Sequence, residues 1–149
     1  MKGLRTLENN SLKTEPQIID LFINQIVLDE NGYWAILLKL GDYQKTISGK
    51  DSFKYNQTEN RIALIAFLTG LKMLKHTSTI VLFTKSEYLI NGILNEFEGT
   101  DSKNQALWAE CAKYAKLHKV HFVLCNPKSN LEEMSCLKKM ILEEISKNK

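Results

Sequence analysis

The pattern of apolar and polar residues divides the chain into a strand-rich first third and a helix-rich remainder. Three apolar runs with many β-branched or aromatic side chains come first, at residues 17–28, 33–40 and 43–49. Two turn sequences, Asp29-Glu-Asn-Gly32 and Gly41-Asp42, separate these runs, and Asn31-Gly32 is typical of the positive φ angles that a hairpin needs. The pattern therefore predicts three consecutive antiparallel strands.

The segment at residues 56–75 carries the helical pattern most strongly. Ile62, Ala66 and Met73 belong to one face with i, i+3, i+4 spacing, and the flanks of that face are apolar as well. Asn56, with Glu59 three residues later, has the pattern of an N-terminal capping box. Because little of such a helix can face water, we expect it to be the central helix, packed on a sheet.

Strands and helices alternate after this helix. The apolar run at 79–84 predicts a strand that is covered on both faces, and Thr84-Lys-Ser-Glu87 is typical of a capping box that opens a helix to about residue 97. The remaining expected elements are a helix at 103–118, a strand at 119–125 and a last helix capped by Asn130. This order predicts an α/β fold: a mixed five-stranded sheet, three antiparallel strands then two parallel, with helices on both faces.

Length and charge add broad limits. With 149 residues the chain is expected to form one domain at 17–149, preceded by a flexible polar lead-in at 1–16 that ends at Pro16. The formal net charge of +3 is weaker than that of a dedicated nucleic-acid-binding domain. Charge therefore permits nucleic acid as a partner without indicating it.

The cysteines and the apolar runs bear on the cellular compartment. Cys111, Cys125 and Cys136 are too few for a disulfide framework, which favours a reducing environment. The first ten residues lack the apolar run of a signal peptide, and no stretch approaches the ~20 apolar residues that span a bilayer. We expect a cytoplasmic protein with no membrane partner.

Several short sequence motifs resemble motifs of the ribonuclease H family and occur in the same order, across roughly residues 17–142. Gly32-Tyr-Trp-Ala-Ile-Leu37 resembles the Gly-Tyr-Gly-Ala-Ile-Leu of that family's second strand. Thr58-Glu-Asn-Arg-Ile-Ala-Leu-Ile-Ala66 is similar to the Thr-Asn-Asn-Arg-Met-Glu-Leu-Met-Ala that opens its central helix. Leu82-Phe-Thr-Lys-Ser-Glu-Tyr88 resembles its Leu-Ser-Thr-Asp-Ser-Gln-Tyr. The resemblance implies the ribonuclease H-like fold.

The family's reaction needs two divalent metal ions held by carboxylates. The resemblance places the four family acids on residues that carry no carboxylate, namely Asn24, Ala63, Lys85 and Ser135. At ~4 Å and an effective dielectric of ~20, one charge pair is worth about 4 kcal/mol, so the Lys85 ammonium would repel a divalent ion by about twice that. The resemblance thus implies a degenerate member with no catalytic residue and no Mg²⁺ or Mn²⁺ cofactor.

Two functions follow from this interpretation. The first is a non-catalytic ribonuclease H-like domain that acts as a binding or assembly module for a protein, for a second copy of itself or for nucleic acid. Asn60, Arg61 and Lys85 would then contact nucleic acid, with lysine meeting a phosphate directly. The alternative is a weak or atypical metal-dependent ribonuclease on RNA–DNA hybrids.

Other candidate chemistry is weaker. His118, His121, Cys125 and Cys136 are zinc-type ligands, but their spacing matches no closed zinc motif. Along one strand His121 and Cys125 would lie ~13 Å apart, so we interpret the cysteines as core residues and this histidine as a strand-edge residue. Trp34 and Trp108 are interpreted as packing residues at the core or its rim.

Overall fold

The computed structural model describes residues 17–51, 58–98, 103–126 and 131–147, and the predicted lead-in at 1–16 lies outside them. Its strands are β1 (Gln17–Leu28), β2 (Asn31–Leu40), β3 (Tyr43–Asp51), β4 (Ser78–Thr84) and β5 (Lys119–Leu124). Its helices are α3 (Glu59–Lys72), α4 (Glu87–Leu94), α5 (Gln105–Ala115) and α6 (Glu132–Lys147). The order of elements is the one that the apolar pattern predicts.

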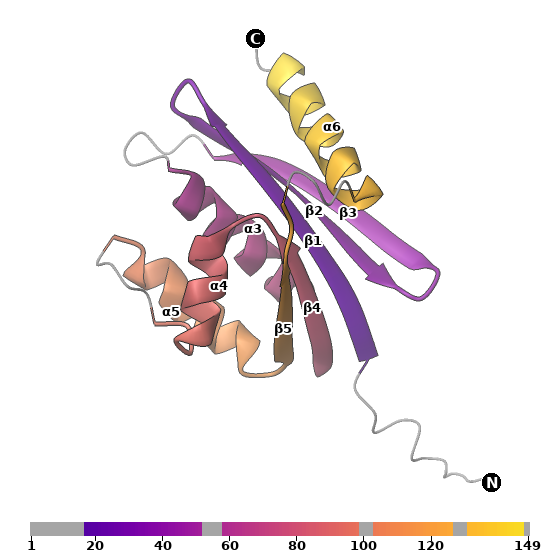
Figure 1. Ribbon diagram of the computed structural model, residues 1–149, viewed down its shortest axis with the longest axis vertical. Helices are drawn as coiled ribbons and strands as arrows, with labels where there is room; N and C mark the ends of the chain where they lie inside the picture. The colour runs from indigo at the N-terminus through magenta and orange to yellow at the C-terminus, as the bar shows by residue number, and fades with distance from the viewer. Residues whose placement is uncertain (1–16, 52–57, 99–102, 127–130, 148–149) are drawn as a thin grey trace, which may run out of the picture.

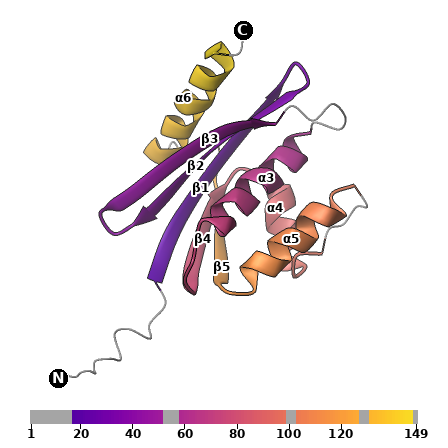
Figure 2. The same ribbon diagram turned by 180° about the vertical axis from the view of Figure 1, so that it is seen from behind.

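The five strands form one mixed sheet in the order β3-β2-β1-β4-β5. The β1–β2 and β2–β3 pairs are antiparallel, whereas β4 runs parallel to both β1 and β5. Helices α3, α4 and α5 lie on one side of the sheet and α6 lies on the other (Figures 1 and 2). The predicted α/β architecture is therefore confirmed.

Alternation along β1 sorts its side chains between the two layers of helices. Leu21 and Ile23 belong to the larger core, which α3 and the fully buried Phe67 fill. Phe22 belongs to the smaller core under α6 and stacks on Phe83 of β4, with ring centroids 4.3 Å apart. Because successive strand residues point to opposite faces, β1 supplies both cores at once.

Helix α3 lies unusually close to the middle of the sheet. A Cβ atom at Gly70 would lie 2.9 Å from both methyl carbons of Leu21, so a larger residue there requires the Leu21 side chain or the helix to shift. The helix begins later than predicted: Thr58 caps it by accepting the Arg61 N–H at 3.1 Å, and the proposed cap Asn56 lies outside the described residues. Thr58 takes this position because its side chain reaches the free N–H three residues ahead.

Helix α4 also begins differently from the prediction. Ser86, rather than Thr84, is its N-cap and accepts the Leu89 N–H at 3.1 Å. The Thr84 hydroxyl instead accepts the Ser86 N–H at 3.0 Å, which holds the cap in place. The helix ends at Leu94 because Glu96 and Phe97 both adopt positive φ angles. Helix α5 is likewise shorter than the predicted 103–118.

The first hairpin turn is shifted from the predicted one. Asp29 and Glu30 carry the positive φ angles, 51° and 65°, and Asn31 already pairs with Leu28. The predicted Asn31-Gly32 therefore belongs to β2, where Gly32 pairs with Val27. The two-residue connection itself agrees with the short turn that the sequence predicts.

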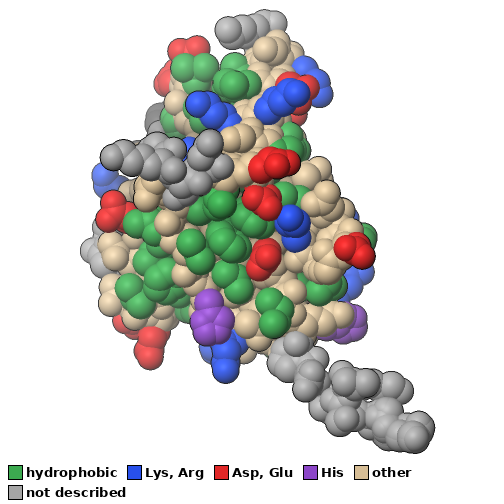
Figure 3. All heavy atoms as spheres, turned by 45° about the vertical axis from the view of Figure 1, so that its right-hand side comes forward, with side chains coloured by type: hydrophobic (Ala, Val, Ile, Leu, Met, Phe, Trp, Pro, Cys, Tyr) green, Lys and Arg blue, Asp and Glu red, His purple; other side chains and the backbone are tan. Residues whose placement is uncertain are grey.

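One part of the sheet lacks a covering helix. Helix α6 packs mainly on β1, β2 and β3, so the same face of β4 and β5 remains open. On this face Ile18 of β1 and Val123 of β5 are 64% and 41% exposed. Figure 3 shows hydrophobic side chains gathered in the centre of this side of the molecule.

Among the helices that the structure describes, none is both long and apolar enough to cross a bilayer.

The contact between α4 and the buried Trp108 gives a test of the packing. A Cβ atom at Gly92 would overlap the Trp108 ring, which is only 2% exposed and is fixed by the hydrogen bond from its Nε1 to the Tyr88 hydroxyl at 2.9 Å. We expect Gly92→Ala to lower the free energy of unfolding by about 1–3 kcal/mol, despite alanine's better helix propensity. Urea denaturation measures this change. Asn91→Ala, on the exposed side of the same helix, is the control and should not destabilise the protein.

Candidate functional site

Two of the family-derived positions, Asn24 and Lys85, lie at the same end of the sheet. In the parallel β1–β4 pair, Phe22 lies opposite Phe83. Asn24 comes two residues after Phe22, and Lys85 comes two residues after Phe83. Strand β3 runs parallel to β1, so both strands end on this side of the sheet. Helix α3 also begins here, where Glu59 of its first turn contacts Gln25 of β1 (Figure 1). The carboxyl ends of neighbouring parallel strands are a common place for a functional site.

Asn24 is buried, and both the nitrogen and the oxygen of its side-chain amide form hydrogen bonds with described residues. Its Nδ2 donates to the carbonyl oxygen of Met134 at 3.5 Å, and its Oδ1 accepts the N–H of Gln25 at 3.0 Å. Asn24 is 2% exposed, so water reaches it little. The contact with Met134 joins β1 to the first turn of α6, directly beside Ser135. The structure thus brings two of the four family-derived positions, Asn24 and Ser135, into one neighbourhood.

Gln25 points to the opposite face and meets the first turn of α3. Its Nε2 donates to Glu59 Oε1 at 3.2 Å, while its Oε1 is buried with no hydrogen-bond partner among the described residues. An unpaired buried acceptor is uncommon in folded proteins. No motif in the sequence indicates this pair, although strand alternation from Asn24 places Gln25 on the α3 side.

The other two family-derived positions differ in their surroundings. Ala63 is fully buried in the larger core, where its methyl group offers no ligand atom. Lys85 is exposed, between the end of β4 and the Ser86 cap of α4. Its positive charge acts on Cys125: burial raises the pKa of this thiol, and Lys85 opposes that rise. Lys85 therefore places a cation near the end of β5.

The predicted nucleic-acid contacts on α3 are not equivalent. Asn60 is exposed in the first turn, as a contact residue would need to be. Arg61 Nη2 lies 3.4 Å from Asp51 Oδ2, with both side chains about a quarter exposed, at 24% and 25%. The guanidinium charge is therefore partly neutralised by Asp51 at the end of β3, a long-range contact that no local sequence pattern indicates.

A second ion pair borders the site. Lys39 Nζ on β2 lies 3.0 Å from Glu133 Oε2 in the first turn of α6. The backbone N–H of Glu133 and the Lys39 ammonium hold the pKa of the Glu133 carboxyl below its usual range. This carboxylate is committed to docking α6 on the sheet.

The residues considered for zinc do not form a centre. Among the described residues, no group of three or more histidine, cysteine or acidic side chains is placed to hold a metal ion. His118 Nδ1 accepts the Ser78 N–H at 3.1 Å, which gives this histidine a structural role. Cys125 is buried as predicted, but Cys136 is exposed, because it precedes the buried Leu137 on the outer side of α6.

Cys111 is also a core residue rather than a nucleophile. Burial, with a smaller contribution from the Glu110 carboxylate, raises the pKa of its thiol to about 12. At neutral pH the thiolate, which is the nucleophilic form, is therefore almost absent. Trp108 is buried, as predicted, and Trp34 packs at the edge of the same core.

The amide of Asn24 supplies the test for this site. In Asn24→Asp the donor to the Met134 carbonyl is lost and a carboxyl group is buried, so we expect a loss of at least ~1–3 kcal/mol in unfolding free energy at pH 7. Burial favours the neutral carboxyl and raises its pKa, so the loss should shrink in acid, where the protonated group can donate again. Denaturation at pH 4 and 7, with and without Mg²⁺, measures both effects.

Asn31→Asp is the matched control for this variant. Asn31 also donates its Nδ2 to a backbone carbonyl, that of Asp29 at 3.2 Å, but in an exposed hairpin. We expect its cost to stay below ~0.5 kcal/mol. Strong stabilisation of Asn24→Asp by Mg²⁺ would contradict the interpretation that this position is built around an amide.

Comparisons with known proteins agree with this fold. The sequence model of the RNase H family matches residues 25–132, a segment that contains Ala63 and Lys85 but neither Asn24 nor Ser135. A ribonuclease H of Acetivibrio thermocellus is 30% identical over 130 residues, which cover 79% of this chain and 86% of that protein. A ribonuclease H of Campylobacter jejuni is 34% identical over 110 residues, which cover 68% of this chain and 73% of that protein.

Solved structures give the same result for the fold. The crystal structure of LC9-RNase H1, a type 1 RNase H with the type 2 active-site motif, has a TM-score of 0.72 at 14% identity and covers 87% of this chain and 72% of its own. RNase H1 from Halobacterium salinarum NRC-1 has a TM-score of 0.64 at 12% identity, over 85% of this chain and 98% of its own. Together with the matched segment, which spans more than half of the sequence, these likenesses show that the chain belongs to the ribonuclease H family.

Proposed function

We propose that this chain is a ribonuclease H-like domain that does not carry out the two-metal reaction and works as a binding or assembly module. The observation that carries the proposal is the set of side chains at the four positions matched to the family acids. They are an amide, a methyl group, an ammonium group and a hydroxyl group, at Asn24, Ala63, Lys85 and Ser135. Divalent magnesium prefers carboxylate oxygens, and this set supplies none.

The surroundings of these residues support the same proposal. The Asn24 oxygen already accepts the Gln25 N–H, and its NH₂ group, which cannot coordinate a cation, faces Met134. The Lys85 ammonium would repel a divalent ion held nearby. These residues do not suit a pair of Mg²⁺ or Mn²⁺ ions, and no catalytic step is assigned to them.

Nucleic acid is one partner that this end of the sheet would suit. Asn60 and Lys85 are exposed, and an amide with an ammonium group is a typical phosphate contact. Arg61 contributes less to such a contact, because Asp51 offsets its charge. We propose that an RNA–DNA hybrid or another nucleic acid would be held here by its backbone, without base-specific contacts.

A protein partner, or a second copy of the chain, is favoured by a different observation. The part of the sheet that α6 leaves open exposes apolar side chains, including Ile18 of β1 and Val123 of the edge strand β5. Figure 3 shows apolar side chains gathered on this side of the molecule. Contiguous exposed apolar surface commonly marks a protein interface.

The three cysteines are free thiols, which suits the cytoplasm as the proposed location.

The alternative function is a weak or atypical metal-dependent ribonuclease on RNA–DNA hybrids. It is favoured by the relatives, whose names are those of ribonucleases H, and by carboxylates near the site at Glu59 and Asp51. Both carboxylates already have partners, Gln25 and Arg61. A metal would have to compete with these contacts.

A cleavage assay separates the two functions. The chain at micromolar concentration, with an RNA–DNA hybrid and either Mg²⁺ or Mn²⁺, should give no product above that of a chelator-treated sample. An active ribonuclease H in the same buffer is the positive control. Robust cleavage that a chelator abolishes and that co-purifies with the folded chain would overturn the proposal in favour of the alternative.

Binding without cleavage is tested by charge reversal. We expect Lys85→Glu to weaken hybrid binding about 3- to 10-fold at low salt and to reduce the slope of log affinity against log salt by about 1. Lys119→Glu changes the net charge equally but lies at the other end of β5, opposite Thr79, and should have little effect. Fluorescence anisotropy measures both. If Lys85→Glu binds like the unaltered chain, the protein partner is favoured over nucleic acid.

A further inference from the structure

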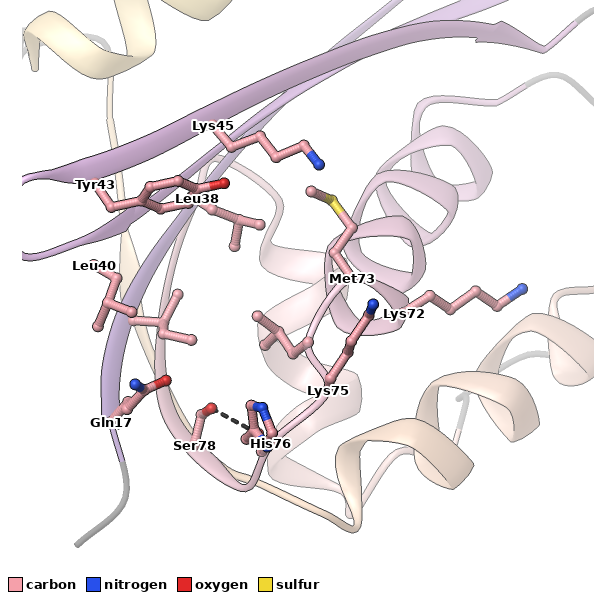
Figure 4. A pocket seen from close by; sticks show the side chains of 12 residues that line it. Gln17, Leu38, Leu40, Tyr43, Lys45, Lys72, Met73, Lys75, His76 and Ser78 are labelled. Atoms are coloured by element: carbon pink, nitrogen blue, oxygen red, sulfur yellow. Dashed lines mark hydrogen bonds between the residues drawn. The ribbon is translucent and has the colours of Figure 1, made fainter. Parts of the chain in front are cut away.

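A second concave site lies at the far end of α3 from the family-derived positions. A cavity of about 420 Å³ opens between the last turn of α3, the starts of β1, β3 and β4, and the end of β2 (Figure 4). The 14 residues of α3 separate the two ends by about 20 Å. A cavity of this size falls in the range of small-molecule sites.

The inner surface of this cavity is apolar. Ile19 and Leu38, which are 5% and 7% exposed, belong to the larger core and form its floor. Leu40, Met73 and Leu74 pack around them and also line the cavity. The floor can therefore accept an alkyl or aryl group and remove it from water.

The mouth of the cavity is cationic. The lining includes three lysines and no aspartate or glutamate. Lys72 is directed away toward α5, where its Nζ lies 3.9 Å from Glu110 Oε2 and 5.6 Å from the centre of the Tyr114 ring. Lys45 on β3 instead reaches toward Met73, and Lys75 lies on the α3 side of the same opening (Figure 4). Two exposed ammonium groups thus flank an apolar floor.

The C-terminal end of α3 also lines this cavity, so the partial negative charge of the helix terminus contributes to the electrostatic potential at the mouth. Its macrodipole is equivalent to about −0.5 elementary charge, whereas the Lys45 and Lys75 ammonium groups each carry a full positive charge. The ammonium groups therefore determine the sign of the potential at the mouth. An anionic group is favoured there, and a cationic group is disfavoured.

The polar part of the rim is held in place by hydrogen bonds. Ser78 Oγ donates to the His76 carbonyl at 2.8 Å, and the Ser78 N–H donates to His118 Nδ1 at 3.1 Å. These contacts fix the connection between α3 and β4 where it borders the cavity. Tyr43, which is 62% exposed, closes the opposite side of the mouth.

We propose that this cavity binds a small amphipathic anion, with its alkyl or aryl body on the apolar floor and its carboxylate or phosphate between Lys45 and Lys75. The site is independent of the proposed function, because it lies at the other end of α3 and shares no residue with it. It would give the domain a small-molecule ligand in addition to a macromolecular partner.

Titration of the ¹⁵N-labelled full chain with sodium octanoate tests this proposal. Saturable shifts are expected at the amides of Leu40, Met73 and Ser78, with octylammonium giving none and 1-octanol binding several-fold more weakly. Octyl phosphate is a second arm: whichever anion binds more tightly identifies the preferred headgroup. If neither anion gives saturable shifts at these amides, the proposal is wrong.

Charge-removing variants complete the experiment. Lys45→Met together with Lys75→Met should weaken binding of the better anion about 3- to 10-fold, the size expected for two partly exposed ion pairs. Lys119→Met, which removes a lysine at the edge of the sheet, is the matched control and should bind like the unaltered chain. Equal affinity for octanol and both anions, or shifts confined to Val123 and its neighbours on the open face, would overturn the proposal. Lys85→Glu should leave octanoate binding unchanged, so this result is separable from hybrid binding.

Discussion

The close approach of α3 to β1 is the contact on which the rest of the structure depends. Gly70 lies against Leu21 of the central strand, and any larger residue at position 70 requires the Leu21 side chain or the helix to shift. With the helix held there, its first turn meets Gln25 at the end of β1, and its last turn closes the cavity above Ile19. One packing contact therefore positions both candidate sites, because a 14-residue helix transmits its placement to both ends.

The two ends of α3 differ in how charge is managed. At the first turn, Glu59 and Arg61 both have partners, Gln25 and Asp51, so little net charge remains on the helix itself. At the last turn, Lys75 and the neighbouring Lys45 stand above an apolar floor. Burial of an ionisable group costs free energy unless it is paired, whereas an exposed lysine keeps its hydration and stays available to a ligand. The charges of the first turn are thus paired within the fold, whereas Lys45 and Lys75 lie exposed beside the cavity.

The sequence predicts the elements well and their ends less well. Apolar periodicity predicts β1 to its last residue and the buried face of α3 that holds Ile62 and Ala66, because burial requires a regular spacing of apolar side chains. Caps are harder, since 84–87 offers two hydroxyls within three residues and only tertiary geometry selects Ser86. At the candidate site, the motifs that resemble the family direct attention to Asn24 and Lys85. The Arg61–Asp51 ion pair and the cavity depend on contacts between residues far apart in the sequence, so no local pattern predicts them.

The short edge strand β5 also presents exposed apolar side chains and backbone groups to solvent. Val123 and Leu124 are exposed on a strand whose outer edge has no partner strand among the described residues, and such edges are templates for intermolecular pairing. Lys119 and the overall positive charge oppose that pairing by repulsion. This protection disappears near the isoelectric point of about 8.7, where the net charge falls to zero. Charge repulsion between copies therefore opposes this pairing more strongly in slightly acidic buffers of low ionic strength than near pH 8.7.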